Sequence, residues 1–230
     1  DDMERGAANA WQRAHDFAGE LRSNPELRKN SQVAGRVVLL LERRLGRELG
    51  STNDKATTEE VQYRVFLCKA LGEFEVVTGI PVLVRVASTP SSSNENELQV
   101  RLAAVEALAV LVHNLRKADP GFTDPDLLNV LLDLSSRQNE PEEMIRTRAA
   151  FALGIYGGDK AAARLEEMTD PFREPSVEAR FNAATGLARL GNEAAIPVLI
   201  EMLDPEQRAG TASEASPNAR LVKQQLIQAN

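Results

Sequence analysis

The feature that most constrains this chain is a stretch that recurs along it. Residues 177–204 read VEARFNAATGLARLGNEAAIPVLIEMLD, and their apolar residues return every three or four positions, as on one face of an α-helix. Gly191 suits the left-handed cap that ends one helix, and Pro197 is tolerated in the first turn of the next. The stretch therefore predicts two helices joined by a tight turn.

Copies of this stretch occur upstream. When Arg146 is aligned with Arg180, identical residues coincide without a gap: Ala149, Ala150, Leu153, Gly157 and Met168 fall on Ala183, Ala184, Leu187, Gly191 and Met202. Another copy begins at Arg64, and one more begins at Arg101 with extra residues in the turn around 119–121. Repeated helix pairs cover their apolar faces by stacking on one another, so an array of helical hairpins is expected.

The repeated residues resemble a known family. The motif Arg146-x-x-Ala149-Ala150-x-Ala152-Leu153-Gly154, its counterpart from Arg180, and the helix 195–204 resemble the HEAT repeat, in particular the short bacterial HEAT-like repeat first associated with bilin lyases. The resemblance covers roughly residues 57–205. It implies an all-α fold, a right-handed α–α superhelix (a HEAT-like solenoid), in a family made up mostly of scaffolds. A tetratricopeptide array would require a Trp-x-x-Leu-Gly-x-x-Tyr pattern, which the core repeat lacks.

The repeats also define the expected organisation of the chain. At 230 residues with 43% hydrophobic content, the chain can bury a substantial core, and we expect a single domain over 1–230. Its expected parts are atypical N-terminal helices within 1–56, repeats at 57–88, 94–136, 141–171 and 175–205, and a C-terminal helix at 216–230.

Four arginines occupy the same position in successive repeats: Arg64, Arg101, Arg146 and Arg180. The resemblance implies that each pairs with carboxylates or backbone carbonyls near a neighbouring turn, so that together they form a structural ladder. A ligand-binding role is the alternative.

The second helices of the repeats carry a second aligned set: Arg85, Asp133, Glu167 and Glu201. The resemblance implies that these helices line the concave side of the superhelix, where the four residues would form an outward row. The sign of this row changes from basic to acidic along the chain, which suits a basic or mixed-charge segment of a protein partner. Ordinary solvated positions are the alternative.

Composition narrows the possible functions. The formal net charge is −7 and the pI is near 5.1, which argues against a nucleic-acid partner. The helix with Arg36, Arg43, Arg44 and Arg47 is the most basic local feature, and it is read as a solvated face or a patch for an anionic partner. No window approaches the about 18 apolar residues of a membrane span. A cytoplasmic location is favoured, with export or membrane tethering left open because the sequence opens at Asp1.

Residues with catalytic or metal chemistry are scarce. The single cysteine, Cys68, excludes an internal disulfide framework and a multi-thiolate metal site. The two histidines, His15 and His113, lie far apart, and the sequence has no His-x-x-x-His, Gly-x-Ser-x-Gly or phosphate-loop motif. We therefore expect no metal, no cofactor and no enzymatic activity.

Together these observations predict a non-catalytic HEAT-repeat scaffold. It would mediate protein–protein interaction through the face lined by the second helices, with a protein partner that the sequence does not identify and with a monomer as the default state. The alternative is a HEAT-like lyase or an accessory factor for a cofactor-bearing protein.

Overall fold

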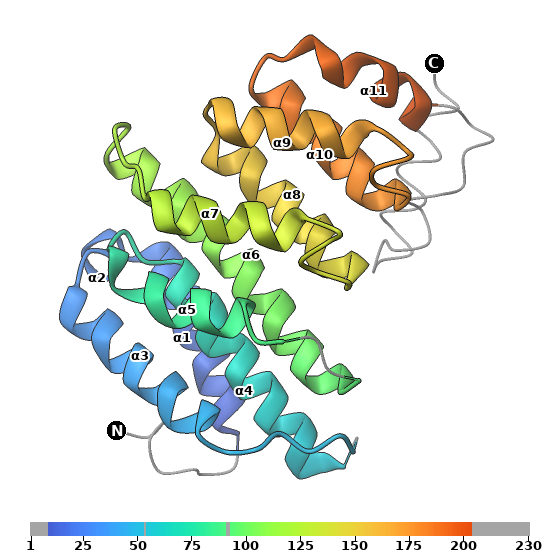
Figure 1. Cartoon of the computed structure of the whole chain (residues 1–230). Coiled ribbons are helices and arrows are strands. Elements are labelled where there is room, and N and C mark those ends of the chain that lie inside the picture. The colour runs from blue at the N-terminus through green and yellow to red at the C-terminus, as the bar shows by residue number, and fades with distance from the viewer. Residues whose placement is uncertain (1–8, 53, 91–92, 204–230) are drawn as a thin grey trace. The chain divides into compact units, whose positions relative to one another are not determined.

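A computed structural model describes residues 9–52, 54–90 and 93–203, and these residues form eleven α-helices, two short 3-10 helices and no strand (Figure 1). The predicted all-α fold is confirmed. The α-helices are α1 (Ala10–Ser23), α2 (Pro25–Arg28), α3 (Ser31–Leu45), α4 (Lys55–Gly72), α5 (Ile80–Ala87), α6 (Glu95–Ala118), α7 (Pro125–Ser135), α8 (Glu143–Tyr156), α9 (Asp159–Thr169), α10 (Val177–Arg189) and α11 (Ile196–Leu203). The 3-10 helices η1 (Val77–Gly79) and η2 (Glu193–Ala195) precede α5 and α11.

Each range expected to hold a repeat contains one pair of α-helices. The pairs are α4 with α5, α6 with α7, α8 with α9, and α10 with α11. The C-terminal helix expected at 216–230 lies outside the described residues. The chain divides into two compact units, Asp1–Val130 and Leu131–Asn230, which are described separately below. The single domain expected from the sequence stays a prediction.

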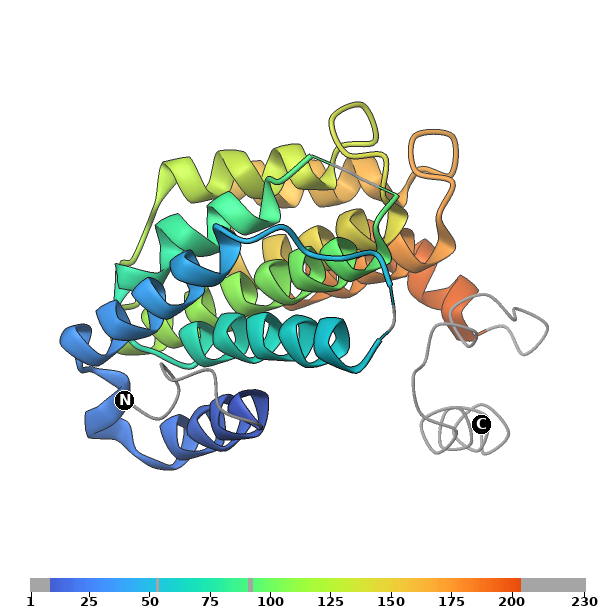
Figure 2. The ribbon, with the colours of Figure 1, turned by 90° about the horizontal axis from the view of Figure 1, so that it is seen from below.

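In the first unit, helices α1, α4 and α6 pack side by side. Helix α3 packs against α4, and helix α5 packs against α6 (Figure 2). Trp11 of α1 stacks on Phe66 of α4 with 6.2 Å between ring centroids. Where α4 meets α6, a Cβ atom added to Gly72 would lie 2.9 Å from the Ala107 carbonyl oxygen. The absence of a side chain at Gly72 therefore lets the two helix backbones approach closely.

The ends of these helices follow ordinary capping chemistry. Asn30 precedes α3, and its side-chain oxygen accepts hydrogen bonds of 3.1 Å from the backbone N–H groups of Gln32 and Val33. Asp54 precedes α4 in the same way. Hydrogen bonds from the Thr52 hydroxyl and from the backbone and hydroxyl of Thr57 stabilise its carboxylate and lower the pKa of Asp54 to about 2.

Helix α6 is the most apolar long element of the first unit. The expectation that no window approaches a membrane span was wrong for this helix. Within the described residues, α6 is the one helix whose length and composition would allow it to cross a membrane, with a mean hydropathy of 1.4 in its most apolar window. Of that window, 61% is buried inside the protein, as in the core helix of a soluble protein. Ala104, Leu108 and Leu111 are completely buried there, so core packing accounts for the apolar composition of α6.

In the second unit, α8 packs against α10, while α9 and α11 cover the other side of this pair. A Cβ atom added to Gly154 of α8 would lie only 2.5 Å from the Cα atom of Gly186 in α10. The turn after α8 uses Gly157 and Gly158 with φ of 71° and 83°, and the turn after α10 uses Gly191 with φ of 70°, as predicted. Glycine thus serves both the turns and the helix crossing of this unit.

Candidate protein-interaction surface

The four arginines predicted to form a ladder are buried, and the exposed fractions are 4% for Arg64, Arg101 and Arg146 and 7% for Arg180. In the first unit, Arg64 Nε donates to Glu60 Oε1 at 2.9 Å, and its Nη2 donates to the carbonyl oxygen of Arg47 at 2.9 Å. Arg101 Nε donates to the carbonyl oxygen of Ala87 at 3.3 Å. Both side chains thus bind the backbone of a segment that precedes their own helix.

In the second unit, Arg146 and Glu174 form a buried ion pair. Arg146 donates to both carboxylate oxygens of Glu174, at 2.8 and 3.0 Å, and its Nη1 donates to the carbonyl oxygens of Glu140 and Pro141 at 3.1 and 2.8 Å. The hydrogen bonds to Glu174 raise the pKa of Arg146. One guanidinium therefore fixes the loop before α8 and the loop before α10. Whether these four arginines act as a structural ladder stays a prediction.

All four residues predicted to form the contact row make polar contacts. Arg85 and Asp133 are the first two of this row along the chain. Arg85 Nη2 donates to Glu42 Oε1 at 2.9 Å, although its side chain is 59% exposed. Asp133 is exposed and accepts a hydrogen bond of 3.0 Å from Asn139 Nδ2. Arg85 belongs to the first unit and Asp133 to the second, so each is considered within its own unit.

Glu201 differs from the rest of the row because it supports a buried charge. Its Oε1 accepts a hydrogen bond of 2.7 Å from Nη2 of Arg180, and its side chain is 35% exposed. A lysine at this position would place a second positive charge beside Arg180, which is destabilising in a low-dielectric environment. Glu201 is therefore unsuitable for testing a binding surface by charge reversal.

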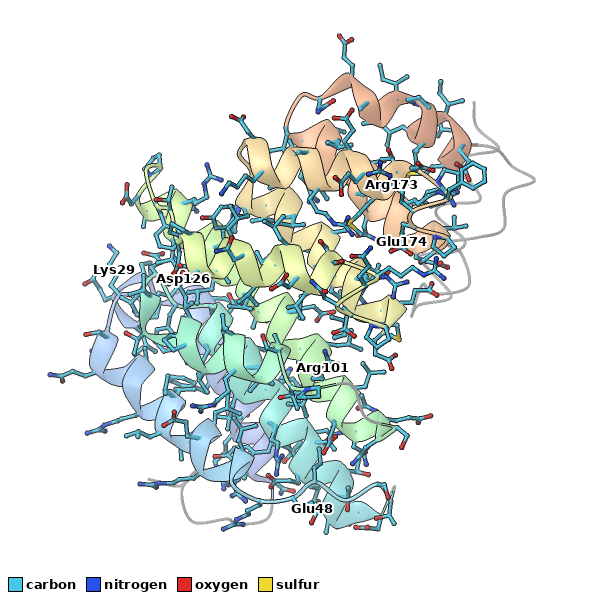
Figure 3. The ribbon with its side chains drawn as sticks, in the orientation of Figure 1. Lys29, Glu48, Arg101, Asp126, Arg173 and Glu174 are labelled. Carbon is cyan, nitrogen blue, oxygen red and sulfur yellow. The ribbon has the colours of Figure 1, made fainter. Side chains whose placement is uncertain are left out.

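The fourth row residue, Glu167, lines a hollow of about 670 Å³ in the second unit. The hollow lies between the loop after α7 and the loop after α9, which project from the same edge in Figure 2. Its lining residues are Ser136, Arg137, Gln138, Arg164, Glu167, Phe172 and Arg173, of which Arg173 is marked in Figure 3. Because the lining contains three arginines and one glutamate, its net charge is positive.

Arg164, one of the lining residues, is held in place by hydrogen bonds. Its Nε donates to Ser135 Oγ at 2.9 Å, its Nη2 donates to the Ser135 carbonyl oxygen at 2.6 Å, and its Nη1 donates to Glu167 Oε2 at 2.9 Å. Arg173 is 63% exposed and lies 3.6 Å from Glu167 Oε1. Arg137 is exposed as well, so the cations at the rim are accessible.

Phe172 stands at the rim with 92% of its surface exposed. The turn that carries it is ordered, because Asp170 Oδ1 accepts from the Phe172 N–H at 2.9 Å, and the Asp170 carbonyl accepts from the Arg173 and Glu174 N–H groups at 3.1 and 2.9 Å. Glu174 is in turn held by Arg146. The fixed turn therefore presents the aromatic ring to solvent, and aromatic residues are among the types enriched at the energetic centres of interfaces.

Sequence reasoning missed Phe172 and the three arginines of the hollow. One signal was present, since the alignment of Arg146 with Arg180 places Phe172 opposite Glu206, a charged residue at the same position of the next copy. A large aromatic residue in a turn that is otherwise polar is a departure from the repeat. The arginines carry no comparable signal, because α9 and two separate loops bring them together.

Cysteine and histidine, the residue types that often carry nucleophilic or metal chemistry, are few in this chain, with one cysteine and two histidines. Burial raises the pKa of the Cys68 thiol to about 12, so it stays protonated at neutral pH. His15 is exposed and meets Phe66 edge-on at 4.9 Å between ring centroids. Across residues 9–52, 54–90 and 93–203, no group of three or more His, Cys, Asp or Glu side chains is placed to hold a metal ion.

The fold and the internal repeats together define a helical repeat protein. Residues 179–205 match the family described as the PBS lyase HEAT-like repeat, a segment that begins in α10 and includes α11. This match confirms the resemblance to the HEAT-like repeat family that the repeated residues carry. Comparisons with the curated proteins and with the solved structures found no match.

Proposed function

We propose that the chain is a non-catalytic HEAT-repeat scaffold that binds a protein partner through its second helices and the loops that follow them. Its repeats would stack as a right-handed α–α superhelix. The packing within each unit supports this proposal, because first helices contact first helices and second helices cover one side of them. Solenoids bury their core by this pattern of neighbour contacts.

The observation that carries the proposal is Phe172 beside the basic hollow. Covering an exposed phenylalanine contributes about 2 kcal/mol, and aromatic residues with arginines are the types enriched at the energetic centres of interfaces. Arg137 and Arg173 line the same hollow as the ring and are exposed, and Arg173 also lies within ion-pair distance of Glu167 and Asp170. The partner would therefore present an apolar side chain next to acidic residues.

This proposal changes the expected charge of the partner. The aligned residues Asp133, Glu167 and Glu201 favour a basic segment, whereas the lining of the hollow favours an acidic one. The difference arises because Arg137, Arg164 and Arg173 lie outside the aligned positions. Glu167 remains part of the surface, where it orients Arg164 and Arg173.

The test is affinity capture from the protein's own cell lysate with four purified forms of the chain: the unmodified chain, two variants of the hollow and one control. Phe172→Ala and Arg137→Glu should each lose a protein that the unmodified chain retains. Val77→Ala is the matched control, because Val77 is an apolar residue of the first unit that is 54% exposed. Thermal unfolding should be the same for all forms, since none of the changes touches the core.

A retained protein that is lost with both hollow variants and kept by the control would support the proposal. Identical captures by the unmodified chain and by Phe172→Ala would refute this surface. A second candidate function, a HEAT-like lyase or accessory factor for a cofactor-bearing protein, is favoured by the description of the matched family alone. A chromophore that co-purifies with the chain would favour that class.

A further inference from the structure

A pocket of about 380 Å³ in the first unit is not used by the proposed interaction surface. It lies among the segment after α3, helix α4, the end of α5 and the first turns of α6. Its charged lining residues are Arg47, Glu48, Arg64, Arg85, Glu97 and Arg101, of which Glu48 and Arg101 are marked in Figure 3. Its volume lies at the lower end of the range for small-molecule sites.

The lip of this pocket is fixed before any ligand arrives. Residues 46–49 line the pocket at this lip. Carbonyl groups of this segment and of the adjoining Gly50 accept hydrogen bonds from side chains of α4, of α6 and of the residue before α6. Arg64 Nη2 donates to Arg47 O, Asn94 Nδ2 to Leu49 O, and Asn96 Nδ2 to Gly50 O, each at 2.9 Å. A preorganised rim lowers the entropy that a ligand loses by ordering its site.

The cations of the pocket are not equally available. Arg64 is paired with Glu60, which also accepts a hydrogen bond from Arg44 at 3.1 Å. Arg85 is paired with Glu42. Arg47 is exposed, and no carboxylate among the described residues forms an ion pair with its side chain. Arg47 can therefore turn to an anion without breaking an existing ion pair.

The remaining walls are apolar and are formed by Leu45, Leu49, Val86 and Val100. A ligand would gain from an apolar body against these side chains and from one anionic group near Arg47. A guanidinium matches the planar geometry of a carboxylate through two parallel hydrogen bonds. Glu48 and Glu97 at the same pocket disfavour a ligand with higher negative charge, such as a phosphate.

We infer that this pocket binds a small amphiphilic carboxylate, with the carboxylate on Arg47 and the apolar body against Leu45, Leu49, Val86 and Val100. Two sources share this chemistry, a short fatty acid and the C-terminal residue of a peptide with an apolar side chain. The inference is independent of the interaction surface, because it uses residues of the first unit alone.

The experiment measures binding to the full chain by isothermal titration calorimetry. Hexanoate represents a short fatty acid and N-acetyl-leucine represents a peptide C-terminus. Their uncharged counterparts are 1-hexanol and N-acetyl-leucinamide. Arg47→Gln removes the available cation, and Arg36→Gln is the matched control, because Arg36 is an exposed arginine of α3 that does not line the pocket.

Binding of at least one acid, with no binding of its uncharged counterpart, is the expected result, and the acid that binds identifies the source. Arg47→Gln should weaken that binding about tenfold, as loss of one charge-assisted contact does, while Arg36→Gln leaves it unchanged. Equal binding of an acid and its counterpart would overturn the inference. So would the absence of binding by both acids, or an Arg47→Gln variant that binds as well as the unmodified chain.

Discussion

Replacing Gly154 with alanine tests the close crossing of α8 and α10. The new Cβ atom would lie 2.5 Å from the Cα atom of Gly186, whereas ordinary van der Waals contacts of Cβ atoms begin at 3.4 Å. The two backbones would have to separate by about 1 Å, because the atoms that the new Cβ would meet belong to the backbone of Gly186 and cannot rotate away as a side chain can. Overpacking of this kind costs up to about 3 kcal/mol. Alanine recovers about 1 kcal/mol through its higher helix propensity, which leaves a net loss of about 2 kcal/mol.

Two other glycines provide a graded comparison. A Cβ atom at Gly186 would meet Leu165 Cδ1 at 3.0 Å and the Cα atom of Gly154 at 3.1 Å. Because the nearest atom ends a flexible side chain, Gly186→Ala should lose less stability than Gly154→Ala. A Cβ atom at Gly35 of α3 would meet nothing within 4 Å, so Gly35→Ala should gain about 0.5–1 kcal/mol.

The assay is urea unfolding followed by far-UV circular dichroism, with the fluorescence of Trp11, the single tryptophan, as a separate probe of the first unit. The expected order of midpoints is Gly154→Ala below Gly186→Ala, both below the unmodified chain, and Gly35→Ala above it. A Gly154→Ala midpoint equal to that of the unmodified chain would refute the close crossing.

Three further predictions follow from individual side chains. Arg146→Met should lower the free energy of unfolding by about 3–5 kcal/mol because it leaves the buried Glu174 carboxylate uncompensated, while Arg173→Met, at an exposed ion pair, should change it by less than about 1 kcal/mol; equal urea midpoints would contradict this. Cys68 should react with a thiol reagent at pH 8 only after unfolding, because burial raises its pKa to about 12, and rapid reaction of the folded chain would argue against that burial. Asp54 should titrate by NMR near pH 2, because hydrogen bonds from neighbouring hydroxyl and N–H groups lower its pKa to about 2; its contribution to stability is therefore complete above pH 4 and lost as the pH falls through about 2, and a midpoint near 4 would contradict the cap.

The sequence predicted the helix pairs because their signals are local. The turn at Gly191 requires a left-handed backbone, which glycine adopts at no steric cost, and φ is 70° there. Pro197 lies in the first turn of α11, where its missing N–H has no intrahelical partner. Repetition of the same pattern from Arg64 to Arg180 then indicated how many such pairs to expect. None of these inferences required knowledge of which helix contacts which.

Only part of the proposed interaction surface was among the residues predicted from the sequence. Glu167 was included because it recurs at one position of the second helices, and its role in binding stays a prediction. Its neighbours Arg164 and Arg173 were not included, because one lies off the aligned positions on α9 and the other lies in the loop that follows. Phe172 had a weak signal as an aromatic residue in a polar turn. Its exposure depends on the fixed turn from Asp170, which hydrogen bonds define.

By itself, the sequence predicted an all-α fold, a series of helix pairs and a HEAT-like repeat, because periodicity, capping and turn residues act over a few neighbouring positions. Only the tertiary structure decided that Gly154 meets Gly186, that Arg146 binds Glu174, and that Arg47 lines a pocket with Val100. These pairs are distant in sequence, and packing brings them together. Two side chains that no local pattern relates can share a site once the helices that carry them are stacked.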